Sequence, residues 1–155
     1  MKGKKQRPTE ATSSRALVIL YSVAALFAAA GLADATYLAV LALTGETAAC
    51  GGSTGCYEVL GSGYAKVAGI PVAVFGLLGY FSAFAFAIFA AFNYARAQKF
   101  FILTVCALFG ATLWLLYVQA FLLHAYCRYC LFSAAISFLL MGLVVATPGR
   151  SKEKP

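Results

Sequence analysis

The cysteines of this chain have the type and spacing that redox chemistry needs. Cys127 and Cys130 form a Cys-x-x-Cys pair, which is close enough in sequence to close a small disulfide ring. The pair precedes the apolar run Leu131–Val145, so we expect it at the N-terminal end of a helix. The positive end of a helix dipole favours the thiolate, which is the nucleophilic form of cysteine. The pair is therefore the first candidate for a redox-active site.

A second pair, Cys50 and Cys56, lies earlier in the chain. The five residues between them, 51–55, include three glycines, which make the connection flexible. A flexible link suits a thiol that must reach two partners. After Cys56, apolar residues at helical spacing predict a short amphipathic helix at the membrane surface. These residues are Tyr57, Leu60, Tyr64 and Val67.

Three further residues with reactive or ionisable side chains lie in or beside apolar runs. Cys106 is far from the other cysteines, and we interpret it as a small buried hydrophobic residue. Asp34 lies in the first apolar run, where an acidic residue is either functional or reaches the interface near the outer end of its helix. His124 is the only histidine. We interpret it as an interfacial residue, with a proton carrier as the alternative.

The elements that carry these residues are predicted to be membrane-spanning helices. Hydrophobic residues make up 63% of the 155 and charged residues 11%, whereas about 25% of an ordinary globular chain is charged. Four apolar blocks have the length of membrane spans, Ala16–Leu43, Ile70–Phe92, Phe100–His124 and Cys127–Ala146. A cleaved signal peptide is the alternative for the first block, but its apolar run is longer than such a peptide needs.

These spans predict an all-α membrane protein, a four-transmembrane-helix bundle in which short links join antiparallel neighbours. Residues 16–146 form this domain, with the short amphipathic helix in the first outer loop, Thr44–Gly69. Pro71 is expected in the first turn of the second span, where its missing N–H is not needed. Residues 1–15 are expected to be a disordered basic arm that lies on anionic lipid, and residues 147–155 a tail on the same side.

The net charge of +7 is distributed unevenly, and this distribution predicts the orientation of the chain. Ten of the twelve basic residues lie before the first span, between the second and third, or after the fourth. Cytoplasmic segments carry such an excess of Lys and Arg, so both termini are expected in the cytoplasm. The same distribution argues against nucleic acid as a partner. With four crossings, the cysteines of both pairs lie at the outer face of the bundle.

Two dithiols on an oxidising outer face indicate a relay, in which a thiolate attacks a disulfide and passes electrons on. Two other interpretations remain open. The four cysteines could form two static periplasmic disulfides in a structural four-span protein, or they could bind zinc as a Cys₄ site. Zinc is disfavoured by the oxidising side and by the five-residue spacer of the first pair.

An ordered set of motifs is similar to bacterial homologues of vitamin K epoxide reductase. The set comprises Cys50-x₅-Cys56-x-x-Val59, Gly61-Ser62-Gly63-Tyr64-Ala65-Lys66, Gly69-Ile70-Pro71, Phe75-Gly76 and Cys127-Arg128-Tyr129-Cys130. The resemblance covers about residues 16–146. It implies a multi-pass enzyme of the bacterial inner membrane that generates disulfides and reduces a quinone, either ubiquinone or menaquinone. Its active site would lie on the periplasmic side.

The resemblance also implies a role for each cysteine. Cys130 would face the quinone, and Cys127 would be its partner, attacked by Cys56 of the loop. Cys50 would exchange with a periplasmic thioredoxin-like protein. Because the chain ends at Pro155, this thioredoxin-like partner is expected to be a separate protein.

Four residues are predicted to contact the quinone, namely Ser62, Tyr64, Val72 and Tyr129. Ser62 matches a family serine near the quinone. The two tyrosines are aromatic residues near the outer end, and an interfacial aromatic belt is the alternative for both. Val72 stands where the animal enzymes have an asparagine that contacts the vitamin. This difference favours plain quinone reduction over epoxide reduction, and no metal is expected.

Overall fold

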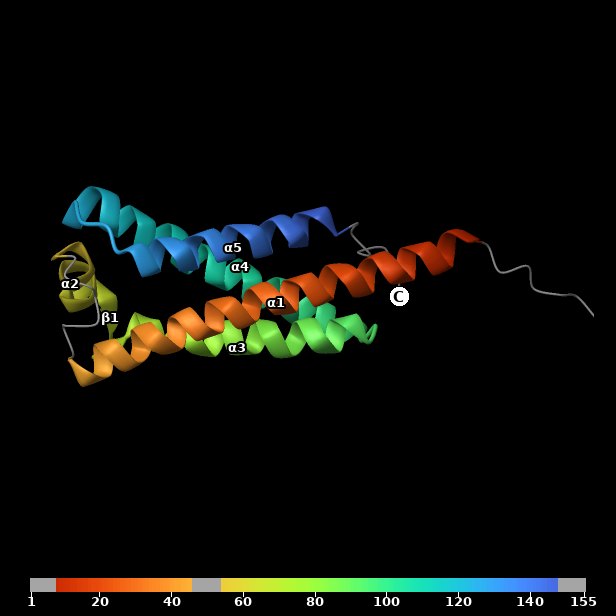
Figure 1. The fold of residues 1–155 in the computed structure, drawn as a ribbon, viewed down its shortest axis with the longest axis horizontal. Helices are drawn as coiled ribbons and strands as arrows, with labels where there is room; N and C mark the ends of the chain where they lie inside the picture. Colours follow the sequence, from red (N-terminus) through yellow and green to blue (C-terminus); the bar gives the residue numbers. More distant parts are fainter. Residues whose placement is uncertain (1–7, 46–53, 148–155) are drawn as a thin grey trace, which may run out of the picture.

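The computed structural model describes residues 8–45 and 54–147, so Cys50 of the first predicted pair lies outside the described residues. Helices dominate this part of the chain (Figure 1). In chain order the elements are α1 Pro8–Thr44, α2 Thr54–Gly61, the 3₁₀ turn η2 Gly63–Ala65, β1 Lys66–Val67, β2 Ile70–Pro71, α3 Val72–Ala91, α4 Ala95–Tyr117, the π-helical segment η3 Val118–Leu123 and α5 Arg128–Ala146.

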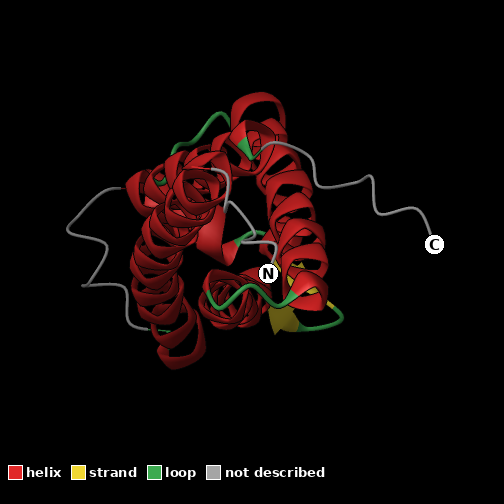
Figure 2. Cartoon of the chain, turned by 90° about the vertical axis from the view of Figure 1, so that its right-hand side faces the viewer, coloured by secondary structure: helices red, strands yellow, loops and turns green. Residues whose placement is uncertain are grey.

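The four long helices form a closed bundle. α1 packs against α3 and α5, and α4 packs against the same two helices. The end-on view shows the helices arranged around a common centre (Figure 2). The chain runs up and down, so α2, the β1–β2 hairpin and the start of α5 lie at one end of the bundle (Figure 1). This is the predicted all-α architecture, with a short helix between the first two spans.

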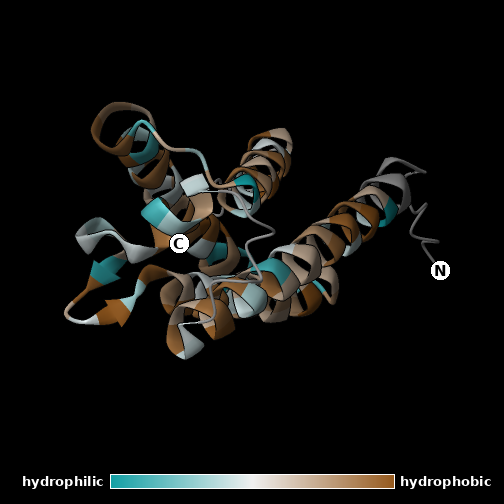
Figure 3. Cartoon of the chain, turned by 60° about the vertical axis from the view of Figure 1, so that its left-hand side comes forward, coloured by the Kyte–Doolittle hydropathy of each residue, from teal (hydrophilic) through white to brown (hydrophobic). Residues whose placement is uncertain are grey.

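Most of the surface of each long helix points away from the bundle. Within the described chain, four helices are long and apolar enough to cross a membrane, at Ser14–Thr44, Val72–Ala91, Ala95–Leu123 and Arg128–Ala146. Only 17–22% of the residues in their apolar windows are buried inside the protein. Hydrophobic residues run along the long helices (Figure 3), and many of the large ones are exposed. They need lipid around them, because water would oppose their exposure. The chain is a multi-pass membrane protein.

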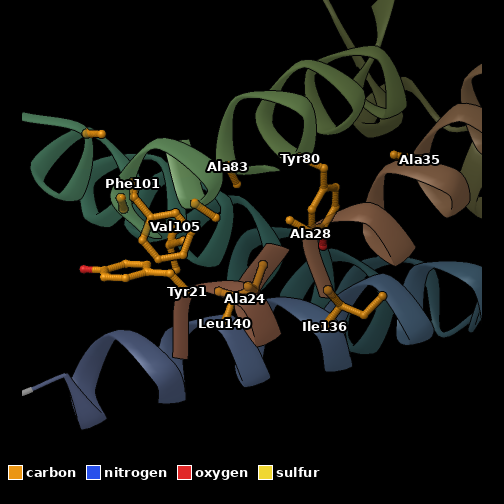
Figure 4. Packing of buried hydrophobic residues seen from close by; sticks show 13 residues of the cluster. Tyr21, Ala24, Ala28, Ala35, Tyr80, Ala83, Phe101, Val105, Ile136 and Leu140 are labelled. Carbon is orange, nitrogen blue, oxygen red and sulfur yellow. The ribbon is translucent and has the colours of Figure 1, made fainter. Parts of the chain in front are cut away.

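Small residues let the helices approach closely in the centre of the bundle. Ala24 and Ala28 of α1 and Ala83 of α3 are fully buried (Figure 4). Gly31 of α1 lies so close to the Tyr80 ring that a side chain at this position would overlap it. Small residues at helix interfaces are typical of membrane proteins, because close packing holds the helices together there. The α1–α3 contact thereby fixes α1 beside the rest of the bundle.

Two helices begin earlier than the apolar blocks predict. α1 begins at Pro8 and not at Ala16, so residues 8–15 of the expected arm are helical. Proline suits the first turn of a helix because it has no N–H to satisfy there. α4 begins at Ala95 and not at Phe100, so it includes most of the expected basic connection. Hydropathy marks only the part of a helix that lies in the hydrocarbon, whereas the helix itself continues into the interface.

The apolar stripe predicted after Cys56 does not lie on a single helix. α2 ends at Gly61, and its buried residues are Cys56 and Val59. Three residues of the predicted stripe, Tyr57, Tyr64 and Val67, are exposed at the protein surface. The stripe was wrong because the helix ends before its last two members, which lie on η2 and β1.

A two-stranded hairpin joins α2 to α3, and the sequence analysis did not predict it. β1 and β2 pair antiparallel. The two residues between them, Ala68 and Gly69, have φ angles of 53° and 83°, as the tight turn of a hairpin requires. Pro71 ends β2 and is the N-cap of α3, so the prediction that placed it within the first helical turn is wrong. A strand end tolerates proline because its ladder position needs no further N–H donor.

Candidate active site

Cys127 and Cys130 lie at the N-terminus of α5, as the sequence predicts. Cys127 directly precedes the helix, and its Sγ accepts a hydrogen bond from the backbone N–H of Cys130, at 3.4 Å. A helix needs an acceptor at this position, because its first N–H groups have no partner within the helix. Cys127 is fully buried and Cys130 is partly buried. Both are free thiols.

Hydrogen bonding lowers the pKa of Cys127 from 9.0 to about 7. The largest cause is the hydrogen bond with the Cys130 side chain, and the backbone N–H groups of Cys130 and Tyr129 add to it. Burial of the sulfur and the carboxylate of Asp34 act in the opposite direction. The thiolate of Cys127 is therefore well populated at neutral pH, so the pair contains a reactive nucleophile.

Gln119 holds the dithiol from the preceding helix. Its side chain is buried, and its Oε1 accepts a hydrogen bond from the backbone N–H of Cys127, at 3.1 Å. It lies in η3, and π-helical turns are frequent at functional sites. The link to α5 begins at His124, which is exposed and has a φ of 50°. The sequence analysis missed Gln119, although a polar side chain inside an apolar span is a signal that could have found it.

α2 brings Cys56 against the dithiol. Cys56 and Cys127 are both fully buried, in a cluster with Leu41, Val59 and Ala125. Cys56 is disulfide-bonded, whereas Cys127 is a free thiol. One cysteine of each predicted pair therefore lies in the same cluster. Exchange between two pairs requires such an approach, because the attacking sulfur must reach the disulfide.

Gly55 allows α2 to lie so close. A Cβ at this position would be 2.8 Å from the backbone carbonyl oxygen of Tyr126, and the backbone cannot yield as a flexible side chain would. α2 therefore packs directly on the segment that precedes Cys127. The glycine next to Cys56 is needed for this close approach and not only for a flexible link.

An apolar cavity of about 570 Å³ adjoins the dithiol. Cys130 lies on its wall, whereas Cys127 is not among the lining residues. All four long helices contribute to the wall, and most of the lining side chains are apolar. Its polar side chains include Tyr80, Thr112, Gln119 and Ser133. A cavity of this size, with a few polar groups on an apolar wall, suits a small and largely apolar ligand.

The hydroxyl groups on this wall form one network across three helices. Tyr80 Oη donates to the backbone carbonyl of Ser133 at 2.9 Å and lies 3.1 Å from Ser137 Oγ. The hydroxyl of Thr112 donates to Ser137 Oγ, at 2.9 Å. The network ties α3 and α4 to α5, so it holds the helix that carries the dithiol.

The four residues predicted to contact a quinone lie in different surroundings. Val72 is on the cavity wall. Ser62, Tyr64 and Tyr129 are not among the lining residues, so within the described chain the structure does not bring the four together. The Ser62 hydroxyl donates to the carbonyl of Val59, and Tyr64 is exposed. The ring of Tyr129 lies 5.2 Å from that of Tyr37.

Asp34 and Cys106 differ from each other in burial. The Asp34 side chain is buried in α1, and its Oδ2 has no hydrogen-bond partner among the described residues. Cys106 is exposed on the outer side of α4, so the prediction that it is a buried hydrophobic residue is wrong. The inward face of this part of α4 is taken by Phe101 and Val105, so the next residue along the helix points outward.

The fold and the site together define a class of protein, a membrane helical bundle with a Cys-x-x-Cys dithiol beside an apolar cavity. Residues 22–145 match the model of the vitamin K epoxide reductase family, and the chain belongs to this family. It is an oxidoreductase of the thiol–disulfide and quinone type, because that is the chemistry of the family. Members use a quinone as electron acceptor and generally work with a thioredoxin-like partner. No curated protein matches the chain.

Proposed function

We propose that the protein is a quinone-dependent thiol oxidase that generates disulfides in a periplasmic thioredoxin-like protein. The main support is that only one of the two cysteines lines the cavity. Cys127 is a buried member of the cluster that contains Cys56, whereas Cys130 packs against that cluster and also lies on the wall of the apolar cavity. A relay needs this division, because one sulfur must exchange with the donor disulfide while the other serves the acceptor.

The electrons pass in three steps. The reduced partner protein transfers two electrons to the Cys50–Cys56 disulfide and becomes oxidised. The Cys56 thiolate then attacks Cys127 in the Cys127–Cys130 disulfide, and Cys130 leaves as a thiolate. Cys50 attacks Cys56 in turn, which restores the first disulfide and leaves Cys127 and Cys130 reduced.

The cavity fits a quinone head group. Its apolar walls suit the ring and the start of an isoprenoid tail, and the side-chain amide N–H groups of Gln119 are donors for a carbonyl oxygen. A quinone bound there supplies the two-electron acceptor that reoxidises Cys127 and Cys130. Ubiquinone and menaquinone both carry the two ring carbonyls that these groups would bind. Val72, an apolar residue on the wall, accords with quinone rather than epoxide reduction.

We also propose that the chain lies in a bacterial inner membrane with both termini in the cytoplasm. Arg15, Arg96 and Lys99 lie near the helix ends that are remote from the dithiol, and Lys66 and Arg128 lie at the dithiol end. This distribution agrees with the excess of positive charge expected for cytoplasmic segments. The dithiol would then open to the periplasm, where disulfides persist.

Trapping of mixed disulfides tests the order of the relay. In the double variant Cys50→Ala/Cys130→Ser, neither resolving thiol remains, so we expect mild oxidation to trap a Cys56–Cys127 disulfide. The matched variant Cys50→Ala/Cys127→Ser should trap a Cys56–Cys130 disulfide in much lower yield. Mass spectrometry of unreduced peptides measures both products. Equal yields would contradict the separate roles of Cys127 and Cys130.

The competing function is a structural four-span protein with two static disulfides. Reduced thioredoxin-like protein and a short-chain quinone, added to the purified full chain, distinguish the two. The oxidase consumes quinone and oxidises its partner, and Cys127→Ser abolishes both. A static protein leaves the quinone and the cysteine states unchanged, and this result would reject the proposed function.

A further inference from the structure

Asp34 is the one buried carboxylate within the described bundle interior, and the relay above does not use it. It lies in α1, with 9% of its side chain exposed, and its Oδ2 has no hydrogen-bond partner. An unpaired carboxylate in such surroundings is costly, and a protein could remove the cost with an asparagine or an apolar residue. A carboxylate that is buried without a hydrogen-bond partner therefore indicates a function, particularly inside a membrane span.

The position of Asp34 along α1 directs it toward the dithiol. Asp34, Leu38 and Leu41 recur at helical spacing and share one face of the helix. Leu38 lies on the cavity wall, and Leu41 belongs to the buried cluster that contains Cys56 and Cys127.

The packing of neighbouring helices leaves few groups for Asp34 to act on. The ionisable side chains that α5 and its N-cap present on this side are Cys127, Cys130 and Tyr129, and Tyr129 is already packed on Tyr37 of α1. α3 presents Tyr80, whose hydroxyl is bound to Ser133. The Asp34 carboxylate interacts electrostatically with both cysteines. The dithiol is thus the reacting group whose ionisation the Asp34 carboxylate influences.

We propose that Asp34 is the proton acceptor of the dithiol during its oxidation, and the donor of that proton to the reduced acceptor. This inference rests on the proposed function and adds a proton route to its electron route. Within the described residues, Asp34 Oδ2 is the one buried carboxylate oxygen without a hydrogen-bond partner.

The step balances as follows. The ready dithiol has a thiolate at Cys127 and a thiol at Cys130. Formation of the Sγ–Sγ bond breaks the S–H bond of Cys130 and releases two electrons and one proton. The electrons go to the quinone, and the proton goes to the carboxylate of Asp34. Reduction of the quinone to the quinol takes up two protons. One proton comes from Asp34. The other comes from water, because Cys127 is already a thiolate and has no proton to give.

Asp34→Asn in the full chain tests this role, with Asp34→Glu as the variant that keeps a carboxylate. Thr36→Val is the matched control, because Thr36 lies on the exposed face of α1 and bonds only to the carbonyl of Leu32. The first measurement needs no quinone. It is the titration of the reduced protein by thiolate absorbance at 240 nm. The second is the rate of quinone reduction, and the third is thermal stability.

We expect Asp34→Asn to have opposite effects on the first two measurements. The pKa of Cys127 falls further, because the carboxylate that opposes its ionisation is gone. Quinone reduction nevertheless slows by on the order of 10²-fold, the usual effect of losing a positioned proton acceptor. Thermal stability is unchanged or higher, because an unpaired buried charge is removed. Asp34→Glu recovers part of the rate, and Thr36→Val behaves as the wild type.

Two results would overturn the inference. If Asp34→Asn lowers the pKa of Cys127 but reduces quinone at least as fast as the wild type, the carboxylate only opposes the thiolate. If the pKa of Cys127 does not move, Asp34 does not act on the dithiol at all. A wild-type protein that reduces no quinone would instead reject the proposed function, while the titration would still report whether Asp34 acts on Cys127.

Discussion

The ionisation of Cys127 sets the pH range in which the dithiol can react. Its pKa of about 7 arises first from the hydrogen bond with the Cys130 side chain and then from backbone N–H groups at the start of α5. The sulfur that caps the N-terminus of α5 is thus also the sulfur whose ionisation α5 favours. A single residue combines the structural role of an N-cap with the chemical role of a nucleophile.

We predict that alkylation of Cys127 in the reduced protein rises with pH and is half-maximal near pH 7. Below this pH the thiolate is protonated, so the rate falls by roughly tenfold per pH unit. Iodoacetamide labelling followed by peptide mass spectrometry measures the midpoint. Cys106→Ser is the control and should leave the midpoint unchanged, because Cys106 lies on the outer side of α4. A midpoint near pH 9 would show that the helix end does not activate this thiol.

The lowered pKa of Cys127 also makes the stability of the folded protein depend on pH. The pKa of Cys127 is lowered by folding, so ionisation stabilises the folded reduced protein. This contribution is complete above the unfolded pKa of 9.0 and is lost as the pH falls through about 7.

At the scale of elements, the approach of α2 to the start of α5 decides whether the two pairs can exchange. The two elements are far apart in the sequence, because α3 and α4 lie between them. Their contact depends on the close fit of Gly55 on Tyr126 and on the cluster around Cys56 and Cys127. The glycine-rich spacer before Cys56 is therefore partly a packing surface.

We predict that Gly55→Ala slows disulfide exchange between Cys56 and Cys127. The added methyl group would overlap the Tyr126 carbonyl and push α2 away, and a displacement of roughly 1 Å can reduce such a rate by about 10²-fold. Gly61→Ala is the matched control, because the same helix has open space at that position. Stopped-flow exchange, started by reduced partner protein, measures both. Equal slowing in the two variants would indicate a general effect on the helix.

At the scale of the whole molecule, the up-and-down bundle brings Cys56 and the Cys127–Cys130 pair to one end and leaves Arg15, Arg96 and Lys99 toward the other. The charge distribution and the number of crossings lead to the same orientation. Reporter fusions test this arrangement. We predict that fusions after residue 94 and after residue 155 report cytoplasm, whereas a fusion after residue 66 reports periplasm. A periplasmic signal at residue 155 would contradict the proposed topology.

The sequence by itself determined the features that depend on local patterns. Apolar blocks of sufficient length must be helices in a bilayer, because every backbone polar group there needs a partner within its own segment. The location of Cys127 and Cys130 at a helix N-terminus followed from the start of the last block. Helix ends were predicted less well, as Pro8 and Ala95 show, because the water interface permits a helix to continue.

Only the tertiary structure decided which side chains meet. The cluster of Cys56 with Cys127 and the Gln119 hydrogen bond to Cys127 both join residues from different elements. No pattern along one helix contains this information, because each contact depends on how two helices are rotated and how closely they pack. In this protein, small residues such as Gly31 and Gly55 set those distances.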